Sequence, residues 1–288
     1  MSPDHQPLTY HERRPPPALR PFIECVWVVS GPLVSSGRAP ERVVPDGCPE
    51  LIVHLGDPFA RRIDGRWVVQ PRAFLAGTLS RPWLLRAGRR VDTIGIRFRA
   101  GETTGVLPVS MAGARDRERA LAGIVGRAAA GALLRSLRRA RTPAQKFAAA
   151  EHWLAARLAE ALPRRSTSAR AVALIREGRG QARIDDVARS LGWSRRRIER
   201  AFARDLGIRP KVYARIVRLN AVLAALDDAE RPRAVDLALE AGYFDQAHLL
   251  RDFRILAGRT PRSRREGDGE LARYFTDPCR LKALLAGE

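Results

Sequence analysis

The chain has 288 residues, of which 45% are hydrophobic, so it is long enough for two domains that each bury a core. Its formal net charge of +21 favours a polyanionic partner, nucleic acid first of all. Arginine greatly outnumbers lysine and alanine is abundant, however, and a GC-rich coding bias gives the same composition. Charge alone therefore leaves the function open.

The cysteines and the apolar segments argue against a disulfide-rich, zinc-binding, secreted or membrane-spanning protein. Cys25, Cys48 and Cys279 are odd in number and lack C-x-x-C spacing, which indicates neither a disulfide framework nor a zinc site. Residues 1–17 lack the apolar run of a signal peptide, and the most apolar later stretch, residues 120–134, contains Arg127 and is too short to span a bilayer. We expect a cytoplasmic protein that has no membrane partner, no metal and no cofactor.

Residues 10–99 have the pattern of an antiparallel β domain, either a sandwich or a barrel. Ile94, Ile96 and Phe98 alternate with Arg97 and Arg99, as in a strand with two different faces. Trp27, Trp67 and Trp83 are expected in the core, with a pocket wall as the alternative. Further short apolar runs are separated by turn residues and predict strands near residues 25–29, 51–55, 67–69 and 74–77.

Residues 109–162 change to alanine, leucine and arginine at helical spacing, with Pro143 at the start of a second helix. These helices serve either to dimerise the protein or to clamp the β domain. The polar segment 163–168 predicts a linker. The fold class is therefore α+β. Its expected parts are a β-rich sensor or dimerisation domain at 1–108, a helical connector at 109–165, an all-α domain at 166–265 and a tail at 266–288.

The strongest pattern is an internal repeat, in which residues 184–210 match residues 234–261 in order, residue class and spacing, apart from one extra residue at Phe244 in the second copy. Each copy predicts a short amphipathic helix, which contains Val187 and Ala188 in the first copy and Leu237 and Ala238 in the second. A glycine that tolerates positive φ then ends the helix, and an aromatic residue follows at the corner. These pairs are Gly192 with Trp193 and Gly242 with Tyr243.

A second helix follows each corner. Ser194 and Asp245 are expected N-caps, and the new helices bury Ile198 with Phe202 and Leu249 with Phe253. The exposed side chains near the two helix starts suit base and phosphate contacts in a major groove. They are Arg195, Arg196, Glu199 and Arg200 in the first copy and Gln246, Ala247, His248 and Arg251 in the second. A helical pattern at residues 212–226 joins the copies and would fix their separation near one DNA turn, roughly 34 Å.

This region resembles the DNA-binding domain of the AraC/XylS family of transcription regulators, most specifically at residues 242–254 and 258–261. The resemblance implies two helix-turn-helix bundles joined by one long helix, with both second helices in adjacent major-groove segments. Position 249 departs from the frequent aromatic, and Glu199 stands among arginines, where it either contacts a cytosine or holds Arg195 and Arg200. For His248, a phosphate contact and a capping or core role both stay open.

The N-terminal region is similar, on Glu41 to Cys48 and Ile94 to Phe98, to the uncharacterised sensor-like domain that precedes some of these DNA-binding domains. The resemblance implies a transcription regulator, an activator rather than an enzyme. Its expected partners are double-stranded DNA, RNA polymerase, a small-molecule effector in the N-terminal domain and, as an open option, a second copy of the chain.

Two alternatives compete with this prediction. In the first, the N-terminal domain performs thiol chemistry or DNA repair through Cys25 or Cys48, although no basic cluster near them lowers a thiol pKa. His54, Asp46 and Glu50 form no recognisable triad. In the second, the protein is a general nucleic-acid binder that acts through charge alone.

Overall fold

The computed structural model describes residues 8–33, 40–161, 165–228, 238–261 and 263. The predicted positions Leu237 and Cys279, the linker residues Pro163 and Arg164, and the expected tail at 266–288 lie outside this part of the chain. Within it, no helix is long and apolar enough to cross a membrane.

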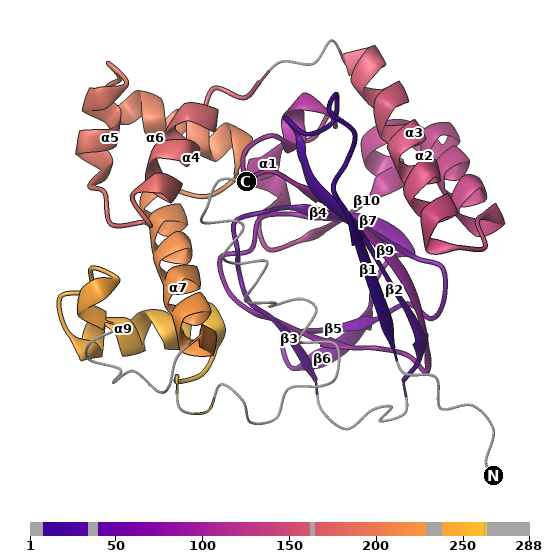
Figure 1. The fold of residues 1–288 in the computed structure, drawn as a ribbon, viewed down its shortest axis with the longest axis horizontal. Helices are drawn as coiled ribbons and strands as arrows, with labels where there is room; N and C mark the ends of the chain where they lie inside the picture. The colour runs from indigo at the N-terminus through magenta and orange to yellow at the C-terminus, as the bar shows by residue number, and fades with distance from the viewer. Residues whose placement is uncertain (1–7, 34–39, 162–164, 229–237, 262, 264–288) are drawn as a thin grey trace.

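Two antiparallel sheets form the N-terminal half of the molecule (Figure 1). The larger sheet has the strand order β1 (Thr9–Arg13), β2 (Ile23–Pro32), β9 (Arg90–Phe98), β4 (Glu50–His54), β7 (Ala73–Ala76), β10 (Glu118–Ala120). The smaller sheet has the order β3 (Glu41–Val43), β8 (Trp83–Arg86), β5 (Ala60–Ile63), β6 (Arg66–Val69). This confirms the predicted β-rich domain and the α+β class.

Alternation along the central strands separates two cores. On β9, Ile94, Ile96 and Phe98 point into a cluster that they share with helical residues, whereas Arg97 lies on the other face of the sheet, toward a cavity between the sheets. Gly95 lies on the same face as Arg97, and a Cβ at this position would come within 2.1 Å of the Trp27 ring. A side chain of this size on β2 therefore requires glycine on the neighbouring strand.

Two long helices, α2 (Leu121–Arg139) and α3 (Pro143–Ala161), cover the outer face of the larger sheet (Figure 1). Leu133 and Leu137 of α2 and Trp153 of α3 are buried in the same cluster as Ile94 and Ile96. Of the two roles considered for these helices, the described contacts support a clamp on the β domain. Pro143 begins α3 as predicted, and Gln145 N donates to Thr142 Oγ1 at 3.2 Å.

Two expectations for these regions were wrong in detail. Residues 109–162 are not purely helical, because β10 extends the larger sheet beside β7 before α2 begins. Trp67 is half-buried under the guanidinium of Arg86, 4.3 Å from its ring centroid, so it is neither core nor cavity wall. Trp27 and Trp83 are buried and also line the cavity.

The C-terminal half is helical. A 3₁₀ turn (Thr103–Gly105) and α1 (Met111–Ala114) lie between β9 and β10, and the helices beyond α3 form two bundles at the ends of the long helix α7 (Figure 1). These helices are α4 (Ala169–Glu177), α5 (Ile184–Ser190), α6 (Arg195–Asp205), α7 (Pro210–Asp228) and α9 (Gln246–Asp252), which continues into a π-helical turn (Phe253–Ala257).

The β domain and the helical bundles share one hydrophobic cluster. Val44 and Cys48, from the loop between β3 and β4, are buried together with Tyr213 of α7. Asn220 of α7 donates from Nδ2 to the Pro45 carbonyl at 3.2 Å. The two halves of the protein are thus packed against each other through the 45–48 loop, which joins two strands and contacts the long helix.

Candidate DNA-binding surface

Two helix-turn-helix units are built around glycine corners. Gly192 follows α5 with φ = 64°, and Gly242 follows helical residues 238–240 with φ = 73°. Both values lie in the left-handed region, where a Cβ is unfavourable. Tyr243 fills its corner with 3% exposure, while Trp193 is half-buried and carries the Arg197 guanidinium 4.7 Å from its ring centroid. The sequence prediction of a sharp turn is confirmed in both units.

The second helix of each unit has the predicted N-cap. Ser194 Oγ accepts a hydrogen bond from Arg197 N at 3.2 Å, and Asp245 Oδ1 accepts one from His248 N at 2.6 Å. Each bond satisfies one of the amide groups that a helix start leaves without an intrahelical partner. The caps define where α6 and α9 begin and therefore which side chains lie in their first turns.

Burial fixes the orientation of both helices. Ile198 and Phe202 on α6 are fully buried, and Leu249 and Phe253 are 1% and 0% exposed at the same spacing in the second unit. Because residues four apart lie on one helical face, the intervening side chains point outward. The exposed predicted residues are Ser194, Arg195, Arg196, Glu199, Arg200, Asp245, Gln246, Ala247 and Arg251.

His248 differs from the other predicted contacts because it is half-buried. Its ring packs edge-on against Tyr243, with 5.1 Å between the ring centroids. This contact gives His248 a structural role at the corner of the second unit, while part of its ring stays accessible.

Arg195 and Glu199 contact each other rather than standing alone on α6. Arg195 donates to Asp185 Oδ1 at 2.9 Å and to Glu199 Oε1 at 3.3 Å. The hydrogen bond to Glu199 and the charge of Asp185 raise the pKa of Arg195 above its ordinary value. Of the two roles considered for Glu199, the geometry of the free protein shows the one in which it holds Arg195.

The long helix α7 ties the two units together through side chains that the sequence analysis did not single out. Arg215 donates to the buried carboxylate of Asp252 at 2.7 Å. Arg218 donates to the carbonyls of Gly180 at 2.8 Å and Gly242 at 3.3 Å, so it touches both bundles. In the sequence, Arg215 and Arg218 look like two exposed arginines on one face of a helix. Only the fold shows that they hold the second unit against α7.

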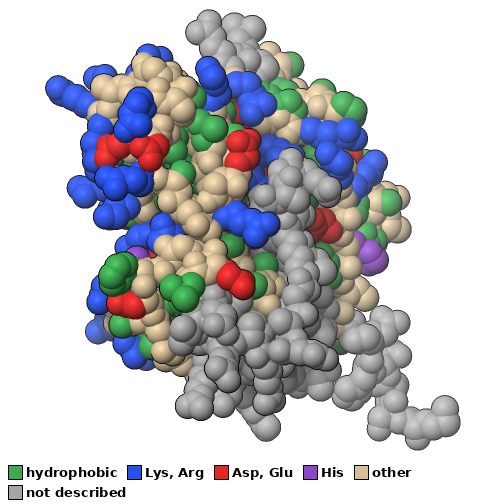
Figure 2. Space-filling model, turned by 60° about the vertical axis from the view of Figure 1, so that its left-hand side comes forward, with side chains coloured by type: hydrophobic (Ala, Val, Ile, Leu, Met, Phe, Trp, Pro, Cys, Tyr) green, Lys and Arg blue, Asp and Glu red, His purple; other side chains and the backbone are tan. Residues whose placement is uncertain are grey.

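Basic side chains gather on the outer side of both bundles. Figure 2 shows Lys and Arg over the upper bundle, with acidic side chains among them, and more Lys and Arg along the same side of the lower bundle. The ion pairs Arg195–Asp185 and Arg189–Asp186 account for part of the acidic charge on α5 and α6. The remaining surface suits a polyanion.

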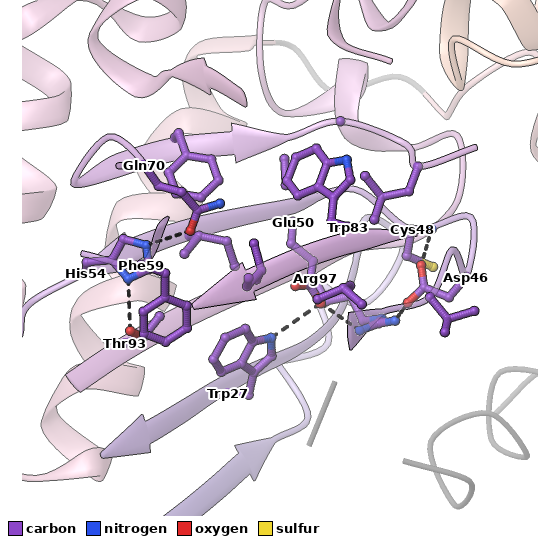
Figure 3. A pocket seen from close by; sticks show the side chains of 18 residues that line it. Trp27, Asp46, Cys48, Glu50, His54, Phe59, Gln70, Trp83, Thr93 and Arg97 are labelled. Carbon is purple, nitrogen blue, oxygen red and sulfur yellow. Dashed lines mark hydrogen bonds and ion pairs between the residues drawn. The ribbon is translucent and has the colours of Figure 1, made fainter. Parts of the chain in front are cut away.

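A second candidate site is a cavity of about 60 Å³ between the two sheets (Figure 3). His54 lies at one end, bonded to Thr93 Oγ1 at 3.0 Å and Gln70 Oε1 at 3.3 Å. Burial lowers the pKa of His54 to about 4, so its ring is neutral at pH 7. Arg97 lies at the other end and forms ion pairs with Asp46 and, at 2.6 Å, with Glu50.

Sequence analysis placed His54, Asp46 and Glu50 near one another but found no pattern that joined them. Cys48 also lines the cavity, and burial raises the pKa of its thiol to about 12. A thiol with such a pKa holds its proton at pH 7 and is a poor nucleophile. The cavity therefore suits binding better than thiol chemistry.

A double helix-turn-helix arrangement with an exposed, capped second helix in each unit defines the class of protein to which the C-terminal half belongs, a helix-turn-helix DNA-binding domain. Two known families match parts of the chain. Residues 187–267 match the family described as a helix-turn-helix domain, and residues 11–119 match a domain of unknown function, DUF6597. The C-terminal region is a helix-turn-helix domain of the AraC type, as its resemblance predicted, and the N-terminal region is a DUF6597 domain.

Known relatives agree with this assignment over limited lengths. An uncharacterised HTH-type transcriptional regulator, YbfI of Bacillus subtilis, is 32% identical over 66 residues, which are 23% of each chain. The chain thus covers about a quarter of that relative.

Solved structures add two similarities. A transcriptional regulator with an AraC-type DNA-binding domain from Chromobacterium violaceum is 30% identical, with a TM-score of 0.31, over 33% of this chain and 85% of that one. ToxT of Vibrio cholerae is 8% identical, with a TM-score of 0.45, over 92% of this chain and 97% of that one.

Proposed function

We propose that the protein is a sequence-specific transcription regulator that reads two adjacent major-groove segments with α6 and α9. The observation that carries this proposal is the repeated unit. Each copy buries one face of its second helix, caps its N-terminus and exposes the other face to solvent. A capped helix start with exposed arginine and glutamine side chains suits both phosphate binding and base recognition.

The long helix sets the distance between the two reading helices. α7 has 19 residues, which at 1.5 Å per residue give about 28 Å. This length is on the order of one DNA turn, roughly 34 Å, which separates successive major-groove segments on one face of a duplex. Arg218 holds both bundles to α7, so the separation is fixed before DNA binds.

Within this surface we assign different roles to the exposed residues. Arg196 and Arg200 on α6, and Gln246 and Arg251 on α9, are proposed base contacts, because arginine and glutamine make bidentate bonds to guanine and adenine. Ala247 suits contact with a thymine methyl group. Ser194 and Asp245 act as caps, Arg195 and Glu199 act as a pair, and His248 lies at the corner beside the DNA backbone.

The other parts of the proposal concern the whole chain. A regulator of this kind works in the cytoplasm without catalysis. As an activator it would contact RNA polymerase, and the β domain would bind a small effector. The proposed parts are residues 1–108, 109–165, 166–265 and 266–288, and a second copy of the chain would double the number of reading helices on DNA.

Selection of preferred duplexes from random DNA with the full-length protein tests the central proposal. We expect a defined site with two conserved blocks whose centres lie about one turn, 10–10.5 base pairs, apart. A pool with no enriched sequence, or equal affinity for the selected site and for random duplex and RNA at moderate salt, would support a general nucleic-acid binder instead.

Single arginine changes test which side chains read bases. Arg200→Ala and Arg251→Ala are each expected to weaken binding to the selected site by roughly 1–3 kcal/mol relative to random DNA, the usual contribution of a bidentate base contact. The control is Arg135→Ala, which removes the same charge from an exposed position on α2. Fluorescence anisotropy at fixed salt measures both affinities. An equal loss on both DNAs would identify a phosphate contact and contradict base reading at that residue.

The thiol alternative has its own test. A screen for thiol or DNA-repair activity with the wild-type protein and Cys48→Ser is expected to show no difference, because the raised pKa keeps the thiol protonated. Turnover that Cys48→Ser abolishes would favour the alternative.

A further inference from the structure

Another hollow, the corner cleft, lies where the turn between α2 and α3 meets the end of the larger sheet. Its volume of about 600 Å³ is in the range usual for small-molecule sites, roughly 300–1,000 Å³. Leu55, Val91 and Leu137 give its wall an apolar part, and none of the described residues that line it is aromatic. The corner cleft therefore offers space and some apolar surface, but no ring on which a nucleic-acid base would stack.

A buried lysine forms an ion pair in the wall of this cleft. Lys146 of α3 is 7% exposed, and its Nζ lies 2.6 Å from Asp92 Oδ1 of β9. The pair joins α3 to the sheet, and its two charges cancel each other. The remaining charged side chains of the wall must therefore be balanced by other groups.

Arginines from three segments line the cleft in addition to this pair. Arg90 begins β9, Arg138 lies in the last turn of α2, and Arg141 lies between α2 and α3. All of them are exposed, and the side chains have no ion-pair partner within the part of the chain that the structure describes. Positive charges that border one hollow create a local potential that attracts an anion.

Charges just outside the lining do not cancel these arginines. Asp57 accepts from the backbone N of Arg90 at 2.9 Å, and if its carboxylate is set against that arginine, the other two stay unbalanced. Further along α3, Glu151 is taken up by Arg13 at 3.5 Å. The next residue on α2, Arg139, is exposed and adds another positive charge outside the cleft. The surplus of positive charge at the corner cleft therefore stands when these neighbours are counted.

We propose that the corner cleft binds a small organic phosphate, with the phosphate group among Arg90, Arg138 and Arg141 and the organic part against the apolar wall. Guanidinium groups make charge-assisted, often bidentate hydrogen bonds to phosphate. A phosphate monoester presents three terminal oxygens, which suits donors from three segments, whereas a carboxylate presents two oxygens in one plane. Its charge of about −1.5 to −2 at pH 7 also offsets more of the surplus than one carboxylate does.

The corner cleft is separate from the proposed DNA-reading surface. Helices α2 and α3 lie on the opposite side of the β domain from α5, α6 and α9 (Figure 1). The β domain therefore stands between the cleft and a duplex that lies along α6 and α9. DNA reading by these helices does not account for the basic lining, and the phosphate site goes beyond the proposed function without resting on it.

Three anions with the same butyl chain test the preference for phosphate on the full-length protein without DNA. They are butyl phosphate, butyl sulfate and pentanoate, titrated at pH 7.5 and constant ionic strength in a calorimeter. We expect butyl phosphate to bind about tenfold more tightly than pentanoate, with butyl sulfate between them. Equal affinities, tightest binding of pentanoate, or no binding of butyl phosphate would overturn the proposal.

Matched arginine variants locate the site. Arg138→Gln should weaken butyl phosphate binding about fivefold, whereas Arg139→Gln, which removes the same charge from the same end of α2 but outside the cleft, should leave it nearly unchanged. Both side chains are exposed, and thermal unfolding without the probe checks that both variants fold. Equal effects of the two changes would mean that overall charge alone attracts the probe, and would overturn the proposal.

A variant of the reading helix excludes the other basic surface. Arg200→Gln on α6 should not weaken butyl phosphate binding. A loss of binding with Arg200→Gln and none with Arg138→Gln would place the phosphate on the DNA-reading surface and overturn the proposal.

A random duplex separates a small-molecule site from a nucleic-acid surface. Arg138→Gln and Arg139→Gln should change the affinity for this duplex equally, and saturating butyl phosphate at constant ionic strength should not displace it. Displacement, together with a larger loss for Arg138→Gln, would assign the cleft to nucleic acid and overturn the proposal. Because probe binding is measured without DNA, the absence of a specific DNA site would contradict the proposed function alone and leave the phosphate site standing.

Discussion

At the scale of single residues, the buried histidine of the cavity shows how a hydrogen-bonded network fixes a protonation state. The amide oxygen of Gln70 can only accept, so Nε2 of His54 carries the proton and Nδ1 accepts from Thr93. The ring also packs against Phe59 at 4.7 Å between centroids. A second proton would have to enter these apolar surroundings as a charge, which burial opposes.

This state predicts a loss of stability in mild acid. The unfolded chain takes up a proton at His54 near pH 6.5, whereas in the folded protein its pKa is about 4. The contribution of the neutral His54 ring to the free energy of unfolding is therefore fully present above pH 6.5, and it is lost as the pH falls toward 4. Urea unfolding at pH 7.5 and pH 5 should differ by about 2 kcal/mol from this residue.

His54→Gln is the matched variant, because an amide keeps hydrogen-bonding capacity but does not titrate in this range. The variant should lose less stability than the wild-type protein between the two pH values, and the difference between the two changes measures the histidine. Parallel pH dependences would show that His54 does not hold its neutral form through burial.

At the scale of elements, the N-cap of α9 stabilises the start of the second reading helix. Asp245 accepts from His248 N there, and the helix continues through a π-helical turn to Ala257. Asp245→Ala should lower the free energy of unfolding by about 1 kcal/mol, whereas Asp245→Asn should retain most of it, since asparagine caps as well as aspartate. Urea unfolding of the full chain measures both. Equal losses would assign the effect to the charge of Asp245 instead.

The helical elements of the repeat could be predicted from sequence because each depends on local chemistry. Gly192 and Gly242, the caps Ser194 and Asp245, and the pair Ile198 and Phe202 act within a few residues of one another, so a repeat at fixed spacing displays them twice. The same holds for strand β9, whose alternation is local. Its two faces were predicted, although the long-range covering of one face by α2 and α3 was not.

The candidate cavity could not be predicted in the same way. Its charged and aromatic residues come from strands that are distant in sequence, and Asp46 and Arg97 meet only because β4 pairs with β9. Strand β10 was missed for a similar reason, because three residues gain strand character from pairing with β7 rather than from their own pattern. Nothing local distinguished Trp67, which is half-buried, from the buried Trp27 and Trp83.

At the scale of the whole molecule, the β domain and the helical domain meet at several places within the described part of the chain. Glu102, after β9, accepts from Arg165 Nε at 2.8 Å and from Ser166 N at 3.0 Å. Gly207 lies against the Met111 carbonyl, and the 45–48 loop packs on α7. Because one hydrophobic cluster contains residues of both halves, we expect them to unfold together.

Two glycines with similar φ angles make it possible to distinguish the cost of backbone strain from the loss of contact between the two halves. Gly47 has φ = 85° and Gly65 has φ = 81°. Because alanine is strained at such angles, an alanine at either position should lower the free energy of unfolding by about 1 kcal/mol. A Cβ at Gly65 meets no atom within 4 Å, whereas one at Gly47 comes within 2.5 Å of the buried Tyr213 ring of α7. Only Gly47→Ala therefore disturbs the contact between the two halves.

Guanidinium unfolding of both variants, followed by tryptophan fluorescence and by helical circular dichroism, tests the coupling. Gly65→Ala should lower the midpoint slightly and keep the two curves coincident, as in the wild-type protein. Gly47→Ala should lower it further and separate the curves, because the helical domain then unfolds without the sheets. Coincident curves for Gly47→Ala would mean that the contacts at Glu102 and Gly207 are sufficient to keep the halves cooperative, and that the 45–48 loop does not carry the coupling.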